Sequence, residues 1–254
     1  MNKGGYYPQI KSNPGQFLYP CNDHLKKWLT DLKKRQVTFL ISGSDPEYVE
    51  WVAGYCLGRD WRSYFDYIVC ASKKPSFFTG KRNFRRWNYH LQGVEDEDIE
   101  TGQYLEANTP YIYIQGNWTQ LKFSMAEFCD QERPKCLYFG DHLIQDVVAA
   151  DLCRLDVVAI VEELDAENHD GSLLNSKRWG SFFYDDGLCS DHLDVIGSAR
   201  MNTLWSNILE KHARLCIAHM EAISDYPVDH GFTIANGQQN KFLGFLPSLP
   251  KCLM

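Results

Sequence analysis

Four short apolar runs, separated by amphipathic patterns, constrain the fold of this chain more than any other feature. The runs are continuous rather than alternating, which indicates strands buried on both faces. The segments between them repeat apolar residues every three or four positions, as helices with one buried face do. Buried strands that alternate with helices favour an α/β fold, with a parallel sheet between two helical layers. The runs lie at residues 37–41, 67–70, 136–139 and 157–161.

End signals and chain length refine this prediction. Asn117 with Gln120 resembles a capping box, which predicts the start of a helix before the third run. With 254 residues and 44% apolar content, the chain is long enough for one domain and an appendage. We predict a core over residues 1–172 and a partly helical C-terminal region over residues 173–254.

Two segments outside the runs have patterns of their own. Residues 79–110 form an insert, in which the basic stretch Lys81 to Trp87 precedes the acidic residues 95–98. Opposite charge blocks predict a solvated loop or a small cap, although the basic stretch also suits a grip on a nucleotide. Apolar residues at helical spacing predict long amphipathic helix between Leu188 and Ile223. Its apolar stripe, from Leu204 to Ile223, suits a homo-oligomer interface as readily as a core.

The composition disfavours several classes of partner. A net charge of −7 argues against nucleic acids and acidic membranes, because proteins that bind phosphate backbones carry a basic footprint. No stretch of the sequence reaches the ~18 apolar residues of a membrane span. The 9 cysteines include no Cys-x-x-Cys pair, which indicates reduced thiols and a cytoplasmic protein. A small anionic ligand stays compatible wherever basic residues converge.

In an open α/β sheet, ligands bind at the carboxyl ends of the strands, so the residues after each run are the candidate site residues. The first run is followed by Ser42-Gly43-Ser44, a loop that offers backbone N–H groups and a helix N-terminus to a phosphate. An ordinary helix N-cap is the alternative. The second run leads to Lys73 and Lys74, whose ammonium groups suit either a phosphoryl group or a solvated surface.

The third run is followed by two carboxylates. Asp141 stands at the predicted strand tip, and Asp146 stands in the first helical turn. Mg²⁺ takes one or two carboxylates in proteins and keeps several waters, so this pair suits a magnesium site. N-capping of the helix by Asp141 is the alternative. A hydroxyl, a lysine and paired aspartates on successive strand tips indicate a phosphate site more strongly together than each does alone.

This order of residues resembles the second, third and fourth motifs of haloacid dehalogenase-type phosphatases. The local sequence is similar to the cytosolic purine 5'-nucleotidase family, and within it to proteins named for a 5'-nucleotidase domain. The similarity covers nearly the whole chain. It is carried by the segments Tyr7 to Lys11, Ser63 to Val69, Lys74 to Phe78, Tyr138 to His142, Lys177 to Phe183 and Ile223 to Phe232.

The resemblance implies a haloacid dehalogenase-like fold and a Mg²⁺-dependent phosphatase that acts on a nucleoside monophosphate or another small phosphate ester. It also implies roles for five residues. Ser42 and Gly43 would bind the phosphoryl oxygens. Lys74 would join Ser42 in catalysis, because its ammonium group neutralises the phosphoryl charge and steadies the nucleophile. Asp141 would bind Mg²⁺ directly, and Asp146 would support that metal site.

The chain departs from its family at the nucleophile. Members begin with an apolar strand that ends in Asp-x-Asp, whose first aspartate attacks phosphorus and whose second serves as acid and base. The acidic segment Asp96-Glu97-Asp98 has this spacing, but it lies in a polar run with no strand before it. The segment from Phe182 to Asp186 has an apolar start but lacks the second carboxylate at the right step.

In the family, the strand that is missing here is central in the sheet, between the strands that end at Ser42 and Asp141. We therefore expect an incomplete sheet, and we expect that Met1 is not the natural start of the protein. An incomplete phosphatase would bind Mg²⁺ weakly through Asp141 and turn over no phosphate ester. The alternative is a non-catalytic pseudoenzyme or an interaction module on the same fold.

Cysteine and histidine residues provide no stronger candidate site. Cys70 lies near Lys73 and Lys74, which would lower the pKa of a thiol, but no histidine is assigned as its base. We therefore predict a buried strand cysteine. His212 and His219 are seven positions apart rather than four, so no zinc-binding helix is predicted.

Overall fold

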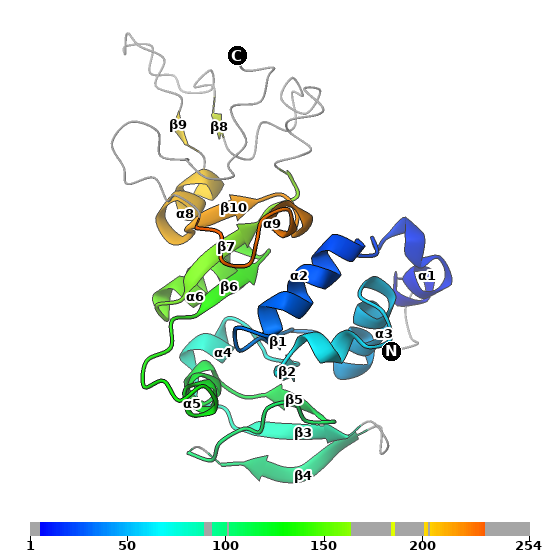
Figure 1. The fold of residues 1–254 in the computed structure, drawn as a ribbon, viewed down its shortest axis with the longest axis vertical. Coiled ribbons are helices and arrows are strands. Elements are labelled where there is room, and N and C mark those ends of the chain that lie inside the picture. The colour runs from blue at the N-terminus through cyan, green and yellow to red at the C-terminus, as the bar shows by residue number, and fades with distance from the viewer. Residues whose placement is uncertain are drawn as a thin grey trace. The chain divides into compact units, whose positions relative to one another are not determined.

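The computed structural model describes residues 6–88, 93–100, 102–163, 184–185, 201–202 and 204–231 (Figure 1). The chain divides into two compact units, and each is described by itself. The predicted boundary between residues 172 and 173 lies outside the described residues. No helix in the described ranges combines the length and the apolar character of a membrane span. Unit 1 comprises Met1–Pro134 with Ser224–Val228, and unit 2 comprises Lys135–Ile223 with Asp229–Met254.

Unit 1 is built on a five-stranded sheet of order β1-β2-β5-β3-β4. Strands β1, β2 and β5 are parallel, whereas β3 and β4 form an antiparallel hairpin beside β5, with β4 outermost (Figure 1). The elements of unit 1 are α1 (Tyr6–Ser12), η1 (Pro14–Gln16), α2 (Asp23–Lys33), β1 (Phe39–Ile41), α3 (Pro46–Cys56), η2 (Trp61–Tyr64), β2 (Tyr67–Cys70), α4 (Ser76–Thr79), β3 (Phe84–Asn88), β4 (Gly93–Ile99), β5 (Ile112–Gln115) and α5 (Trp118–Phe128).

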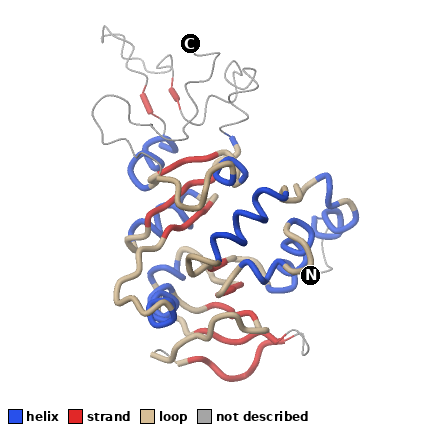
Figure 2. The backbone as a smooth tube through the Cα atoms, viewed as in Figure 1, coloured by secondary structure: helices blue, strands red, loops and turns tan. Residues whose placement is uncertain are grey.

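Helices cover both faces of this sheet (Figure 2). Strand residues point to alternate faces. Ile68 and Cys70 of β2 therefore share a core cluster with Val49 of α3. On the other face, the hydroxyl of Tyr67 donates a 3.2 Å hydrogen bond to the carbonyl of Ser124 in α5. The predicted α/β class is confirmed, although the sheet of unit 1 is mixed rather than purely parallel.

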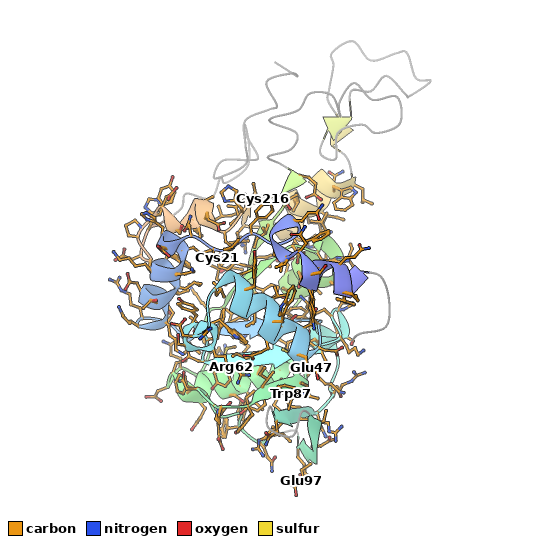
Figure 3. All side chains as sticks on the ribbon, turned by 90° about the vertical axis from the view of Figure 1, so that its right-hand side faces the viewer. Cys21, Glu47, Arg62, Trp87, Glu97 and Cys216 are labelled. Atoms are coloured by element: carbon orange, nitrogen blue, oxygen red, sulfur yellow. The ribbon has the colours of Figure 1, made fainter. Side chains whose placement is uncertain are left out.

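Two strands of the sheet, β3 and β4, lie in the insert at residues 79–110, so the solvated loop predicted for its basic stretch is wrong. That stretch contains β3, because Phe84 and Trp87 reach the core and are 0% and 5% exposed. Arg85 lies between them and pairs with Asp98 of β4 at 3.0 Å. Figure 3 shows Glu97 of β4 at the outer rim, away from Trp87. The burial of its aromatic residues, rather than its charges, therefore determines the structure of the insert.

Unit 2 is built on a parallel sheet of order β10-β7-β6, with β7 in the middle. The long helix predicted between Leu188 and Ile223 is wrong, because α8 ends at His212 and the strand β10 follows it. Pairing with β7 decides this: Arg214 N donates to Val157 O at 2.7 Å. The elements of unit 2 are β6 (Leu137–Gly140), the π-helix η3 (Leu143–Val148), α6 (Ala149–Leu152), β7 (Asp156–Ile160), β8 (Tyr184–Asp185), β9 (Met201–Asn202), α8 (Leu204–His212), β10 (Leu215–Ile217) and α9 (Glu221–Ser224).

Candidate functional site

The loops that follow β1 and β2 meet at the edge where β1, β2 and β5 end, which we call the carboxyl edge of unit 1. Three backbone hydrogen bonds join the Ser42 loop to the chain that leads to Lys74. The structure therefore brings the two predicted phosphate contacts onto neighbouring strand ends, where ligands of α/β sheets bind. The bonds run from Ser42 N to Val69 O, from Ala71 N to Ser44 O and from Ser72 N to Ser42 O, at 2.8, 2.8 and 3.1 Å.

The Ser42 loop is open toward a ligand. The Ser42 Oγ accepts a hydrogen bond from Ser44 N at 3.1 Å, which leaves the hydroxyl hydrogen available as a donor. Gly43 is exposed, and a Cβ added there would meet nothing within 4 Å. The N-cap position of α3 is Asp45, whose side chain makes no capping hydrogen bond. Ser42 is therefore not the cap of the helix, and its loop is geometrically suited to receive an anion.

The segment after β2 is strained and contains a buried hydroxyl. Ala71 and Lys73 have φ angles of 48° and 52°, in the left-handed region that costs a non-glycine residue about 1–2 kcal/mol. Between them, Ser72 is 1% exposed, and within the described part of the chain its Oγ has no hydrogen-bond partner. Strain and unpaired polar groups concentrate at functional sites. Ser72 was not predicted from the sequence, because only packing reveals its burial.

The lysines and the cysteine at this edge differ in exposure. Lys73 is exposed and Lys74 is half-buried, so the two do not form one solvated pair. Cys70 is fully buried, and burial raises the pKa of its thiol to about 12. A thiol with that pKa stays protonated and is a poor nucleophile near neutral pH. The prediction of a buried strand cysteine is confirmed.

The tip of β6 in unit 2 carries the two predicted aspartates in different surroundings. Asp141 is exposed, whereas Asp146 is 1% exposed. The hydroxyl of Tyr138 donates to Oδ1 of Asp146 at 2.7 Å, and His142 N donates to Oδ2 at 3.3 Å. Burial and the neighbouring Asp146 carboxylate raise the pKa of Tyr138, so its hydroxyl keeps the proton that it donates. Asp146 is thus fixed behind the strand tip.

The turn after β6 is capped by a histidine. The Nδ1 atom of His142 accepts hydrogen bonds from Ile144 N and Gln145 N, both at 3.2 Å, so the alternative of N-capping by Asp141 is wrong. The helix that follows is a π-helix, a form that is rare and frequent at functional sites. Gly140 is required before it, because a Cβ there would lie 2.4 Å from the Cβ of Asp146.

The donor set of unit 2 fits Mg²⁺ through one carboxylate. Asp141 presents an exposed carboxylate, and Mg²⁺ in proteins is held by one or two carboxylates with several waters. Both oxygens of Asp146 already accept hydrogen bonds, so this residue suits support rather than direct ligation. Among the residues that the structure describes, no group of three or more His, Cys, Asp or Glu side chains could hold a metal ion.

Neither candidate for Asp-x-Asp follows a parallel strand. The segment Asp96-Glu97-Asp98 was expected in a polar run, but it lies on β4, the antiparallel outer strand. Its Asp98 carboxylate pairs with Arg85. Asp185 ends the two-residue strand β8, which pairs antiparallel with β9. Ser42 and Lys74 lie in unit 1, whereas Asp141 and Asp146 lie in unit 2.

Comparison with known proteins identifies the family. Residues 2–178 match the model of the 5' nucleotidase family. Two proteins named 5'-nucleotidase domain-containing protein 1, from Bos taurus and Homo sapiens, are each 29% identical to this chain, over 277 and 280 residues. Both alignments cover 99% of this chain and 59% of the relative, so the chain spans about three fifths of the length of these curated relatives.

A more distant relative matches a shorter part. The human 5'-nucleotidase domain-containing protein 2 is 33% identical over 133 residues, which cover 51% of this chain and 23% of the relative. The family model covers well over half of the chain, and the relatives agree with it. The resemblance predicted from the motifs is confirmed: the chain belongs to the 5' nucleotidase family, which implies a haloacid dehalogenase-like fold.

Proposed function

We propose that this chain carries the phosphate-binding and magnesium-binding part of a cytoplasmic 5'-nucleotidase, a Mg²⁺-dependent phosphoric monoester hydrolase. The observation that carries the proposal is the joined pair of loops at the carboxyl edge of unit 1, with Ser42 and Gly43 on one loop and Lys74 beyond the other. Family membership supports a nucleoside monophosphate, or another small phosphate ester, as the ligand. The net charge of −7 argues against nucleic acid.

In this proposal each residue has a defined task. The hydroxyl of Ser42 and the N–H of Gly43 donate to the phosphoryl oxygens, while the ammonium group of Lys74 offsets their charge. Asp141 would hold Mg²⁺, and Asp146 would keep the strand tip in place. When bound, a Mg²⁺ ion would supply Lewis-acid chemistry.

We propose that the sheet is incomplete because the strand with the aspartate nucleophile is not part of this chain. Strand β1 ends the sheet of unit 1 and β6 ends the sheet of unit 2; within the described ranges, no strand pairs with the outer side of either. We therefore expect the chain alone to bind its ligand but to release no phosphate.

A non-catalytic role is the second candidate. It is supported by the fate of the carboxylates that have Asp-x-Asp spacing, since Asp98 is paired with Arg85 on an outer strand. A pseudoenzyme of this kind would bind a nucleotide without hydrolysing it, and the bound nucleotide would change its affinity for a partner. The two candidates differ in one respect: the nucleotidase requires a longer endogenous protein with an Asp-x-Asp strand upstream of this chain, and the pseudoenzyme does not.

Two measurements test the proposal. The first is phosphate release from adenosine 5'-monophosphate with Mg²⁺; we expect none above the blank, and release that disappears in Asp141→Ala would contradict the incomplete site. The second is the intact mass of the endogenous protein, captured with an antibody to residues 138–146. A mass well above 29.4 kDa supports the nucleotidase, and a mass of 29.4 kDa supports the pseudoenzyme.

A further inference from the structure

Unit 1 contains a basic stretch, of which the proposed phosphate site uses only Lys74. Residues 67–94 contain six basic side chains and no acidic one, in a chain whose net charge is −7. Arg85 pairs with Asp98 at 3.0 Å, and Arg86 lies 5.1 Å from the ring centroid of Tyr111. The remaining four are Lys73, Lys74, Lys81 and Arg82.

Strand register places Lys81 and Arg82 at the carboxyl edge. Strand β3 is antiparallel to β5, and its first residue, Phe84, is opposite the last residue of β5, Gln115. Strands β5, β2 and β1 run in the same direction, so the start of β3 lies at the edge where they end. Lys81 and Arg82 lie three and two residues before Phe84, the start of β3. In the sheet, β3 is three strand positions away from β1, which corresponds to a distance of about 14 Å between the two strands.

The backbone beneath these two residues is fixed while their side chains are exposed. The Nδ2 of Asn117, a residue that is 3% exposed, donates to Arg82 O at 2.9 Å. Gly116 N donates to Asn83 O at 3.2 Å. Lys81 and Arg82 themselves are exposed. Cationic side chains on an anchored backbone lose less freedom when they bind an anion than side chains on a mobile loop.

The charge balance at this edge favours anions. Three exposed acidic residues lie there as well: Asp45 follows the Ser42 loop, Glu47 is in the first turn of α3, and Glu100 follows the end of β4. Four basic residues against three acidic ones leave the edge with an excess of one positive charge, although the chain as a whole is acidic. A local field of this sign attracts a ligand with more than one negative group.

We propose that Lys81 and Arg82 form an outer anion subsite, which takes the second anionic group of a ligand whose first phosphoryl group lies on Ser42 and Lys74. This inference rests on the proposed function and narrows its substrate class. The ligand is a small organic molecule with two separate phosphate groups, such as a nucleoside bisphosphate. The guanidinium of Arg82 suits such a group because its planar fork binds phosphate oxygens in pairs.

The test compares two ligands by isothermal titration calorimetry on the 254-residue chain at constant ionic strength. Adenosine 3',5'-bisphosphate should bind about fivefold more tightly than adenosine 5'-monophosphate, as two exposed ion pairs allow. The double variant Lys81→Gln with Arg82→Gln should lose this advantage and keep its affinity for the monophosphate. The matched control is Lys34→Gln with Arg35→Gln, which removes the same two charges at the opposite end of β1, before the strand begins. This variant should still bind the bisphosphate more tightly than the monophosphate.

Each other outcome counts against the inference. Equal affinity of the wild type for both ligands overturns it, and so does an advantage that persists in the Lys81→Gln and Arg82→Gln variant. If the monophosphate still binds and Ser42→Ala weakens that binding, the proposed function stands without the outer subsite. If neither ligand binds to the wild type, the proposed phosphate site fails and the subsite fails with it.

Discussion

The hydroxyl oxygen of Tyr138 lies 2.7 Å from Oδ1 of Asp146, in a hydrogen bond between two buried side chains. Tyr138 is on β6, and Asp146 is in the π-helix that follows it. The bond therefore ties the turn that carries Asp141 back to its own strand. The position of the exposed Asp141 carboxylate thus depends on the buried side chain of Tyr138, which is not itself a metal ligand.

Loss of this hydrogen bond should destabilise the protein. Tyr138→Phe keeps the ring and leaves Oδ1 of Asp146 without its donor, so we expect a loss of about 2 kcal/mol in the free energy of unfolding. Urea denaturation measures the change. The control is Tyr111→Phe, which removes a 2.9 Å hydrogen bond to Glu106 at an exposed position and should cost about 0.5 kcal/mol or less. If both variants lose the same free energy of unfolding, the buried bond to Asp146 stabilises the protein no more than an exposed one.

Gly140 should tolerate no side chain. In Gly140→Ala the new Cβ would lie 2.4 Å from the Cβ of Asp146, so the π-helix must shift, at an expected cost of about 2 kcal/mol. Thermal unfolding of the variant measures the cost. Gly54→Ala, within α3, adds the same methyl group with nothing within 4 Å and should stabilise by about 0.5–1 kcal/mol. A Gly140→Ala protein as stable as the wild type would contradict the close approach.

Stability should fall at alkaline pH, in part through Cys70. Burial raises the pKa of this thiol from 9.0 to about 12, so the folded chain retains a proton that the unfolded chain loses. The buried, protonated thiol contributes fully to the free energy of unfolding below pH 9. This contribution is lost as the pH rises toward 12, and the free energy of unfolding then falls by up to about 1.4 kcal/mol per pH unit. Cys70→Ala should reduce the slope of unfolding free energy against pH in this window. An unchanged slope would refute the contribution.

The sequence predicted those elements that are buried on both faces or have clear end signals. The four apolar runs became β1, β2, β6 and β7, and Asn117 caps α5 through a 2.9 Å hydrogen bond from Gln120 N. Strand β5 was not predicted, because its short run, Ile112–Gln115, lies next to the charged insert. Strand β10 was missed because helical spacing continues through Leu215–Ile217, and pairing with β7 is visible only in three dimensions.

The positions of the candidate site residues could be predicted from the sequence, whereas the contacts that support them could not; the roles of these residues stay predictions. Ser42, Lys74, Asp141 and Asp146 follow strand ends, which a sequence pattern can locate. The bond from Tyr138 to Asp146 spans eight residues through a π-helix, whose extra residue per turn changes which side chains meet. A glycine directly before the tip aspartate was the one local signal of this close packing.

The central claim is that Ser42 and Lys74 bind the phosphoryl group of a nucleotide, and its most direct test is calorimetric titration with adenosine 5'-monophosphate. The account predicts binding to the wild-type chain that weakens about tenfold in Ser42→Ala and in Lys74→Gln. Ser12→Ala, which removes an exposed hydroxyl on α1, should leave the affinity unchanged. Absence of binding to the wild type, or equal binding to all four proteins, would contradict the account.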